Sequence, residues 1–222
     1  GAYLSLNDRT KRTRRILIAD WIPSLNKGEM AILFGMLKTF ETCGEVEVSI
    51  FSFSPPLDRE RYPQNIKIIN VASDLHLGGG SLPEKLGLIM IFVWLFAMLQ
   101  HIFFSMLYVV IGDRALKLMN KAIWKEYCRS DVIITCHDDV SCVYGHRLLR
   151  FFPLYITLLA KNLGKPVVIY ANGCYSKSPF QISEFGLWKI LARYVLNKAD
   201  LITARDEESY EYLKNVSGNK AH

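Results

Sequence analysis

The sequence predicts an α/β domain with a doubly wound parallel sheet, and the clearest unit of this fold lies near the amino terminus. Ile16–Asp20 is a short, almost continuous apolar run bounded by charge, which is typical of a strand buried on both faces. A loop containing Asn26 and Gly28 follows, and from Glu29 to Phe40 apolar residues recur at helical spacing. A strand, a loop and a helix in this order open a doubly wound domain.

The start of this first helix is a candidate anion site. Backbone N–H groups without helical partners gather at a helix start, and the helix dipole places partial positive charge at the same end. An ordinary turn between a strand and a helix explains the same spacing. The pattern alone therefore leaves both interpretations open.

The alternation of strands and helices continues along the chain and predicts one Rossmann-like domain. Further buried strands are expected at Glu47–Phe53, Asn65–Val71, Asp131–Cys136, Pro166–Ala171 and Asp200–Ala204. Further helices are expected at Arg114–Arg129, His146–Leu163, Ile182–Asn197 and Asp206–Lys214. A polar loop with several prolines joins the first two of these strands. Because no segment repeats, we expect one domain over residues 15–216, with a basic mobile arm at 1–14 and a truncated linker at 217–222.

An apolar run, Leu86–Ile111, interrupts this pattern. As one helix it would extend about 39 Å at roughly 1.5 Å per residue, longer than a hydrocarbon core of about 30 Å. The strands on either side of the run should pair in one sheet, which cannot be divided between two sides of a bilayer. We therefore expect a hydrophobic helical insertion at residues 84–112 that touches a membrane from one side, which predicts a peripheral or monotopic protein at the cytoplasmic face.

Two arrangements satisfy that expectation. The run could form a helical hairpin bent near Gln100–His101, or it could lie as helices in the membrane interface. A helix pair buried entirely in protein is the alternative without a membrane.

Charge and cysteine content narrow the classes of partner. A formal net charge of +6 suits an anionic ligand, a membrane surface or nucleic acid. No basic stripe interleaved with aromatic residues accompanies it, so a nucleic-acid partner is not expected. The five cysteines are scattered and lack Cys-x-x-Cys spacing, which argues against a disulfide framework or a metal site and favours reduced thiols.

Three segments at strand ends carry a resemblance to a known family. The loop Asn26–Glu29 (NKGE) resembles the Asn-x-Gly-Asp motif that opens the first helix of polysaccharide pyruvyl transferases. Lys165–Gly173 (KPVVIYANG) resembles the strand and glycine turn of that family. Ala199–Ser209 (ADLITARDEES), the most specific of the three, looks like its strand ending in Arg-Asp followed by a Ser. The chain departs from the family pattern at Glu29, in place of Asp, and at Cys136–Asp139, where the family often has a Gly-rich turn.

The resemblance implies both an architecture and a reaction. Such enzymes have two Rossmann-like domains similar to a GT-B glycosyltransferase, and this chain would be the N-terminal half. The family transfers the enolpyruvyl group of phosphoenolpyruvate to two hydroxyls of a sugar, forming a pyruvate ketal and releasing phosphate. Phosphoenolpyruvate is then the donor substrate, a polysaccharide or lipid-linked glycan is the acceptor, and no cofactor is implied.

This chemistry requires cations for the carboxylate and the phosphate. The resemblance assigns donor binding to Arg205, because a guanidinium grips such anions in bidentate fashion. A salt bridge to a neighbouring acid is the structural alternative for Arg205. The other donor-binding candidates are Asn26, Gly28, Asn172, Gly173 and Ser209. For Ser209 a helix cap formed with Asp206 explains the pattern equally well.

Acid–base chemistry is expected from a different strand end. His137 stands beside Asp138 and Asp139 where a buried strand finishes. An imidazole next to a carboxylate can act as an acid or a base near neutral pH, so His137 is the catalytic candidate. The two aspartates are acceptor-binding candidates. A loop histidine with a structural role fits the same pattern.

Two other functions remain compatible with the sequence. The chain could be half of a GT-B-like glycosyltransferase that uses a nucleotide sugar. It could also be a non-enzymatic, membrane-attached module whose sheet presents Leu86–Ile111 to partners. The sequence does not indicate an oligomeric state.

Overall fold

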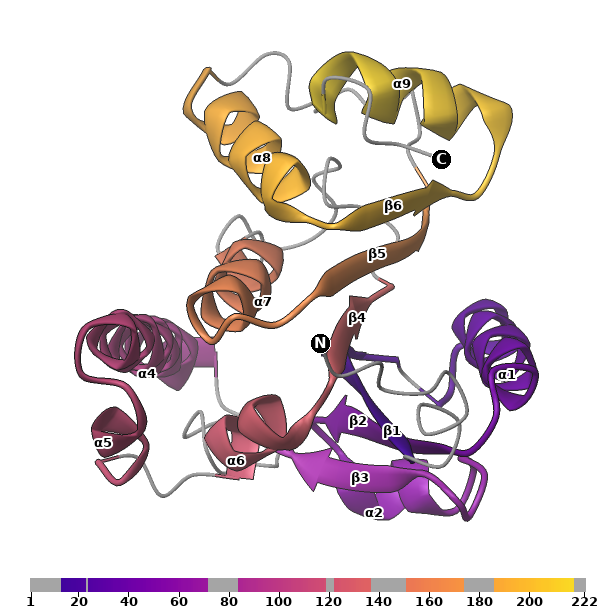
Figure 1. Ribbon diagram of the computed structural model, residues 1–222, viewed down its shortest axis with the longest axis horizontal. Helices are drawn as coiled ribbons and strands as arrows, with labels where there is room; N and C mark the ends of the chain where they lie inside the picture. Colours follow the sequence, from indigo (N-terminus) through magenta and orange to yellow (C-terminus); the bar gives the residue numbers. More distant parts are fainter. Residues whose placement is uncertain are drawn as a thin grey trace, which may run out of the picture.

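In the described part of the chain, six parallel strands form a central sheet (Figure 1). The computed structural model describes residues 13–22, 24–71, 84–118, 122–136, 151–173 and 186–217. The strands are β1 (Arg14–Trp21), β2 (Val46–Ser52), β3 (Lys67–Asn70), β4 (Val132–Thr135), β5 (Val167–Asn172) and β6 (Leu201–Ala204). Their order across the sheet is β3-β2-β1-β4-β5-β6, and every neighbouring pair is parallel. The predicted α/β class with a doubly wound parallel sheet is confirmed.

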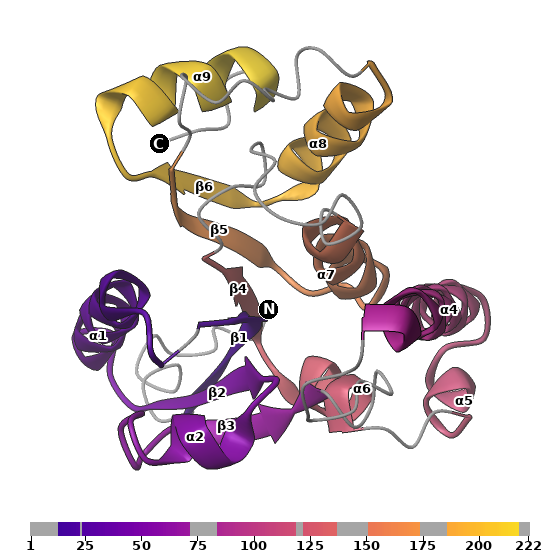
Figure 2. The ribbon, with the colours of Figure 1, turned by 180° about the vertical axis from the view of Figure 1, so that it is seen from behind.

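Helices cover both faces of this sheet (Figures 1 and 2). They are α1 (Lys27–Glu41), α2 (Pro55–Arg59), α4 (Glu84–Ile111), α5 (Asp113–Leu116), α6 (Ala122–Arg129), α7 (Phe151–Asn162), α8 (Gly186–Lys198) and α9 (Glu207–Ser217). One core cluster packs α1 against alternate residues of β1 and β2, such as Ile18 and Ile50. A second cluster joins α4, α6 and α7 to the opposite face, where Leu17 and Phe51 point. Alternate residues of a strand face opposite sides, so both sides of these strands are apolar.

Several boundaries differ from the prediction. The proline-rich segment after β2 contains the short helix α2, because Pro55 and Pro56 occupy its first turn, where a missing N–H breaks no helical hydrogen bond. The helix expected at Arg114–Arg129 is divided into α5 and α6, with a turn at residues 117–118. β1 begins at Arg14, so the sheet starts within the segment predicted as a mobile arm. The rest of that arm and most of the predicted linker, residues 1–12 and 218–222, lie outside the described residues.

The apolar run folds as α4, one continuous helix between β3 and the segment that leads to β4. The hairpin bent near Gln100–His101 is therefore wrong. Ala97 and Met98 of α4 are buried in the core cluster shared with α7. Within the described part of the chain, no helix combines the length and hydropathy that crossing a membrane requires.

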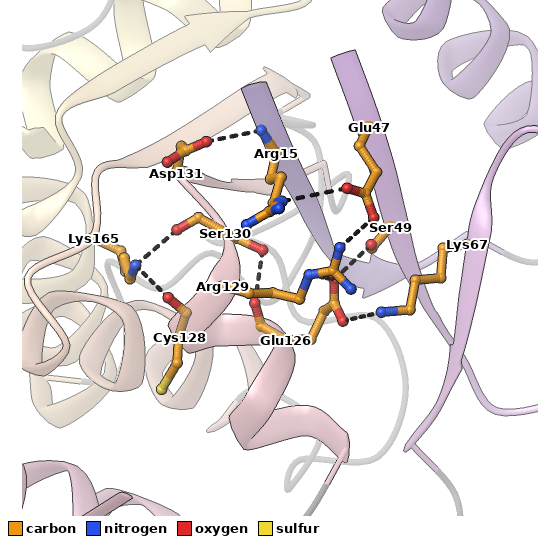
Figure 3. A network of polar contacts seen from close by, with 10 residues as sticks. All are labelled: Arg15, Glu47, Ser49, Lys67, Glu126, Cys128, Arg129, Ser130, Asp131 and Lys165. Atoms are coloured by element: carbon orange, nitrogen blue, oxygen red, sulfur yellow. Dashed lines mark hydrogen bonds and ion pairs between the residues drawn. The ribbon is translucent and has the colours of Figure 1, made fainter. Parts of the chain in front are cut away.

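A network of charged and polar groups links α6 to the amino ends of the strands, which form the amino edge of the sheet (Figure 3). The carboxylate of Glu126 on α6 is 3% exposed; it accepts a 2.7 Å hydrogen bond from Ser49 Oγ of β2 and a 2.6 Å bond from Lys67 Nζ of β3. Lys165, just before β5, donates to the carbonyl oxygens of Cys128 and Ser130 at the end of α6. A cation there satisfies helix carbonyls that lack N–H partners. The network therefore ties α6 to strands on both sides of it.

Glu126 tests the contribution of this network to stability. Replacing a buried acceptor leaves its partners unsatisfied, so Glu126→Ala should lower the free energy of unfolding by about 1–3 kcal/mol. Glu47 is the matched control, because its contacts with Arg15 and Arg129 are half exposed. Glu47→Ala should cost less than about 1 kcal/mol. Urea denaturation of the two variants checks the ranking, and equal losses would contradict a dominant role for Glu126.

Candidate functional site

The guanidinium of Arg205 lies against the turn at the end of β5. Arg205 follows β6, and its side chain is exposed. A Cβ atom built on buried Gly173 would stand 2.7 Å from Arg205 Nη2 and 2.9 Å from Cζ. Such separations are too short for any residue with a side chain, so the absence of a Cβ at position 173 is what admits the guanidinium. The structure thus brings together two of the predicted donor-binding residues.

The end of β5 adopts an unusual backbone at this point. Ala171 has φ = +50°, the left-handed region that non-glycine residues rarely adopt. The pairing register with β6 shifts between Ile169 and Asn172, and Thr203 Oγ1 accepts a 2.8 Å hydrogen bond from the Ala171 N–H. Asn172 then pairs with Ala204, directly before Arg205. Strained backbone of this kind clusters at binding sites, and no feature of the sequence predicted it.

Asp206 and Ser209 begin α9 as a helix cap. The Ser209 N–H donates to Asp206 Oδ1 at 2.8 Å, and the Ser209 side chain is fully buried. Hydrogen bonds from the Ser209 hydroxyl and N–H, aided by the nearby charge of Arg205, hold the pKa of Asp206 below its usual value. The buried Ser209 hydroxyl therefore serves the cap, while Arg205 is left in front of the helix start.

Asn26 forms the corresponding cap at the end of β1. Its Oδ1 accepts hydrogen bonds from the N–H groups of Gly28 (3.0 Å) and Glu29 (3.3 Å), and its Nδ2 donates to Glu29 Oε1 at 2.9 Å. Asn26 and Glu29 thus form a reciprocal capping pair. Because the cap uses the N–H groups of Gly28 and Glu29, an anion near α1 would gain mainly from the dipole of the helix.

The loop between β1 and the Asn26 cap is held by hydrogen bonds to α2 and to the segment that follows it. Buried Asp58 of α2 accepts a 3.4 Å hydrogen bond from the Ser24 N–H and a 2.5 Å bond from Ser52 Oγ. The hydroxyl of Tyr62 donates to the Ile22 carbonyl. Burial, together with the charge of Asp58, raises the pKa of Tyr62 above its usual range, so the hydroxyl keeps the proton that it donates.

The sheet reverses its winding between β1 and β4, and a buried carboxylate links the two strands there. From β1 the chain adds β2 and β3 on one side and then β4, β5 and β6 on the other. Asp20, 1% exposed near the end of β1, accepts a 2.7 Å hydrogen bond through Oδ2 from the Cys136 N–H. Open α/β sheets bind ligands at the carboxyl edge beside such a reversal. The sequence placed Asp20 in the strand but gave no sign of this bond.

The remaining candidate residues, which were predicted for catalysis and acceptor binding, follow β4 in the sequence. Cys136 is the last described residue after β4, and His137, Asp138 and Asp139 lie outside the described residues. Among the described residues, no group of three or more His, Cys, Asp or Glu side chains is placed to hold a metal ion.

Comparison with known proteins identifies the family. A family model described as polysaccharide pyruvyl transferase matches residues 26–221. The chain belongs to the polysaccharide pyruvyl transferase family. No curated protein sequence matches it.

The matched region contains every candidate residue, from Asn26 at the α1 cap to Ser209 in the first turn of α9. Membership places the protein among transferases whose acceptor is a glycan. In this pyruvyl transferase the carboxyl edge therefore carries two capped helix starts, a buried carboxylate at the reversal and an exposed guanidinium over a glycine turn. A guanidinium in that position can bind a carboxylate or phosphate with two parallel hydrogen bonds.

The Asp206 cap should make the stability of the fold depend on pH in a defined direction, and replacing Asp206 should remove that dependence. The lowered pKa means that the cap stabilises the fold above the unfolded pKa of about 3.9, and that this stability is lost as the pH falls through the folded pKa. Asp206→Ala should cost about 0.5–2 kcal/mol at pH 7, with a shrinking difference from the wild type below about pH 4. Denaturant unfolding at several pH values measures it.

Asp206→Asn is the control, since asparagine caps a helix without titrating in this range. Its stability should stay near that of the wild type at pH 7. A constant deficit of Asp206→Ala from pH 7 down to pH 2 would show that the carboxylate charge plays no part in the cap.

Proposed function

We propose that this domain binds phosphoenolpyruvate at the β5–β6 end of the sheet, with Arg205 gripping its carboxylate or phosphate. The protein then transfers the enolpyruvyl group to two hydroxyls of a glycan. The observation that carries the proposal is the Arg205 guanidinium held over Gly173. In this position the guanidinium occupies space that a Cβ at residue 173 would take.

The reaction that this site would support balances as an addition and a displacement. An acid protonates the methylene carbon, and the oxygen of one sugar hydroxyl bonds to the adjacent carbon as it loses its proton to a base. The bond from that carbon to the phosphate oxygen breaks and phosphate leaves; the oxygen of the second hydroxyl bonds to the carbon in its place and loses its proton to a base, which completes the ketal. Cationic groups stabilise the carboxylate and the leaving phosphate, which is the role of Arg205.

Two features that attract anions, the guanidinium of Arg205 and the positive end of α1, lie along this part of the carboxyl edge. The guanidinium is turned toward β5, and only β4 separates β5 from β1, a span of about 10 Å at two strand spacings. A donor with a carboxylate at one end and a phosphate at the other could extend from Arg205 toward the positive end of α1, near Asn26 and Gly28. Asn172 would border the same turn of β5.

Acid–base and acceptor roles belong in this proposal to the segment after β4. His137 would supply or remove the proton, and Asp138 and Asp139 would bind hydroxyls of the acceptor. These residues follow Cys136 at the reversal of the sheet, where parallel folds place their ligands. We also propose that the domain is the N-terminal half of a GT-B-like enzyme whose second domain covers this edge.

Arg205→Ala should weaken phosphoenolpyruvate binding about 10- to 100-fold, because it removes charge-assisted hydrogen bonds. Isothermal titration calorimetry with the chain measures the change, and phosphate release by the full-length enzyme with a glycan acceptor should fall with it. Arg61→Ala is the control, because Arg61 is exposed in the segment before β3, the edge strand farthest from β6 in the strand order. Unchanged binding in Arg205→Ala would overturn the donor assignment, and selective binding of a nucleoside diphosphate would favour a glycosyltransferase.

Gly173→Ala tests the contact itself while leaving Arg205 in place. The new Cβ would push the guanidinium aside, so donor binding should fall by at least tenfold although the chain still folds. Gly35→Ala is the matched control, since Gly35 lies in the middle of α1 and a Cβ there would meet no atom within 4 Å. It should stabilise α1 by about 0.5–1 kcal/mol and leave donor binding unchanged. Calorimetry measures donor binding by both variants, and thermal unfolding measures their stability. Normal donor binding by Gly173→Ala would refute the proposed site.

A further inference from the structure

Helix α4 buries two polar side chains among apolar ones on its inner side and exposes a row of apolar side chains on its outer side. His101 and Ser105 are fully buried against α7, where His101 Nδ1 and Tyr155 Oη share a 2.7 Å hydrogen bond. Asn162 Nδ2 donates to Ser105 Oγ at 2.9 Å. A helix on the surface of a water-soluble domain typically has charged and polar side chains on its outer side, with its apolar side facing the core.

The outer side of α4 is a continuous apolar stripe. We name as the α4 stripe six side chains at alternating spacings of four and three residues, which are Phe92, Phe96, Leu99, Phe103, Met106 and Val110. Each is between 54% and 79% exposed. At roughly 1.5 Å per residue the stripe is about 27 Å long. Among the described side chains of α4, Gln100 is the one exposed polar group.

The surroundings of the stripe favour a lipid surface over water or an ordinary protein surface. The sequence has no Asp, Glu, Lys or Arg between Leu86 and Ile111, so the sides of the stripe lack the charged residues that usually flank a helix-pairing seam. Large exposed apolar patches of this kind mark partner or membrane contacts. Three aromatic rings on the stripe suit the boundary between headgroups and acyl chains.

The exposed charged residues of helices α5, α6 and α8 indicate which type of lipid the stripe would contact. Most of the described exposed charged side chains on and beside α5, α6 and α8 are basic, with Asp113 and Asp200 as the acidic ones; the basic ones are Arg114, Lys117, Lys125, Arg193 and Lys198. By contrast, α9 exposes Glu207, Glu208 and Glu211. Basic residues near an apolar contact are attracted to the negative surface of a membrane rich in anionic lipids.

We propose that the α4 stripe docks the protein on an anionic bilayer, with α4 lying along the surface. The packing of α4 against α7 holds the inner side of the helix in the protein, so only the outer side is available to lipid. The apolar side chains would enter the boundary of the acyl chains, and the flanking basic residues would meet phosphate headgroups. This interaction requires no donor or acceptor substrate, so its test is independent of the pyruvyl transfer.

Flotation with vesicles of 70% phosphatidylcholine and 30% phosphatidylglycerol tests the proposal. The wild type should float with these vesicles and bind at least tenfold less to pure phosphatidylcholine. The double variant Phe96→Glu/Phe103→Glu should lose at least tenfold in vesicle binding while its circular dichroism spectrum is retained, because both side chains are exposed. Phe34→Glu is the matched control, since Phe34 is 49% exposed on α1 at the opposite face, and it should bind as the wild type.

Two further measurements keep the result decisive. Arg114→Glu/Lys117→Glu leaves the stripe intact and should weaken binding to anionic vesicles roughly tenfold. Brominated acyl chains should quench the added fluorescence of Phe103→Trp and not that of Phe34→Trp. If the wild type fails to float and instead forms a dimer in analytical ultracentrifugation that Phe96→Glu/Phe103→Glu abolishes, the stripe joins two copies of the chain and the membrane proposal is wrong.

Discussion

The common direction of the six strands is the constraint on which the candidate site depends. Because every strand is parallel, all of the carboxyl ends meet at one edge, and the loops that follow them are brought together although they are far apart in sequence. The buried bond from Asp20 to the Cys136 N–H fixes β1 and β4 to each other where the winding reverses. At the amino edge, the Glu126 network joins strands and helices through charges that are already paired. The candidate binding residues that the structure describes lie at the opposite, carboxyl edge.

The position of Arg205 results from three local features on two neighbouring strands. The positive φ of Ala171 and the register shift turn the end of β5, and Gly173 provides a backbone without a Cβ. Asp206 starts α9 immediately after Arg205, so the arginine side chain is held at the beginning of a helix whose N–H groups are capped. A cation beside a helix start and a glycine turn is an environment for an anion. The hydrogen bonds from Ser209, with a smaller contribution from the charge of Arg205, lower the pKa of Asp206 at the same helix start.

The positions of the strands could be predicted from the sequence, but the contacts between the strand ends could not. A strand buried on both faces is apolar along its length, so each of the six strands could be located within a few residues. Prolines at the start of α2 resembled a loop because their effect depends on position in the helix. The role of Asp20 and the backbone of Ala171 could not be predicted, since both arise from pairing with strands distant in sequence. The resemblance singled out Arg205 and Gly173 separately, and the β5–β6 pairing shows that they touch.

The direction of α4 connects the two proposals. α7 runs from the carboxyl edge to the amino edge, because it joins the end of β4 to the start of β5. Its contacts with α4 advance in step, from Tyr155 with His101 to Asn162 with Ser105, so the two helices run in the same sense. The first half of α4, with Phe92 and Phe96, therefore lies toward the carboxyl edge. A bilayer docked on the α4 stripe would extend beside that edge, where an acceptor glycan linked to a lipid would be held close to the donor bound by Arg205.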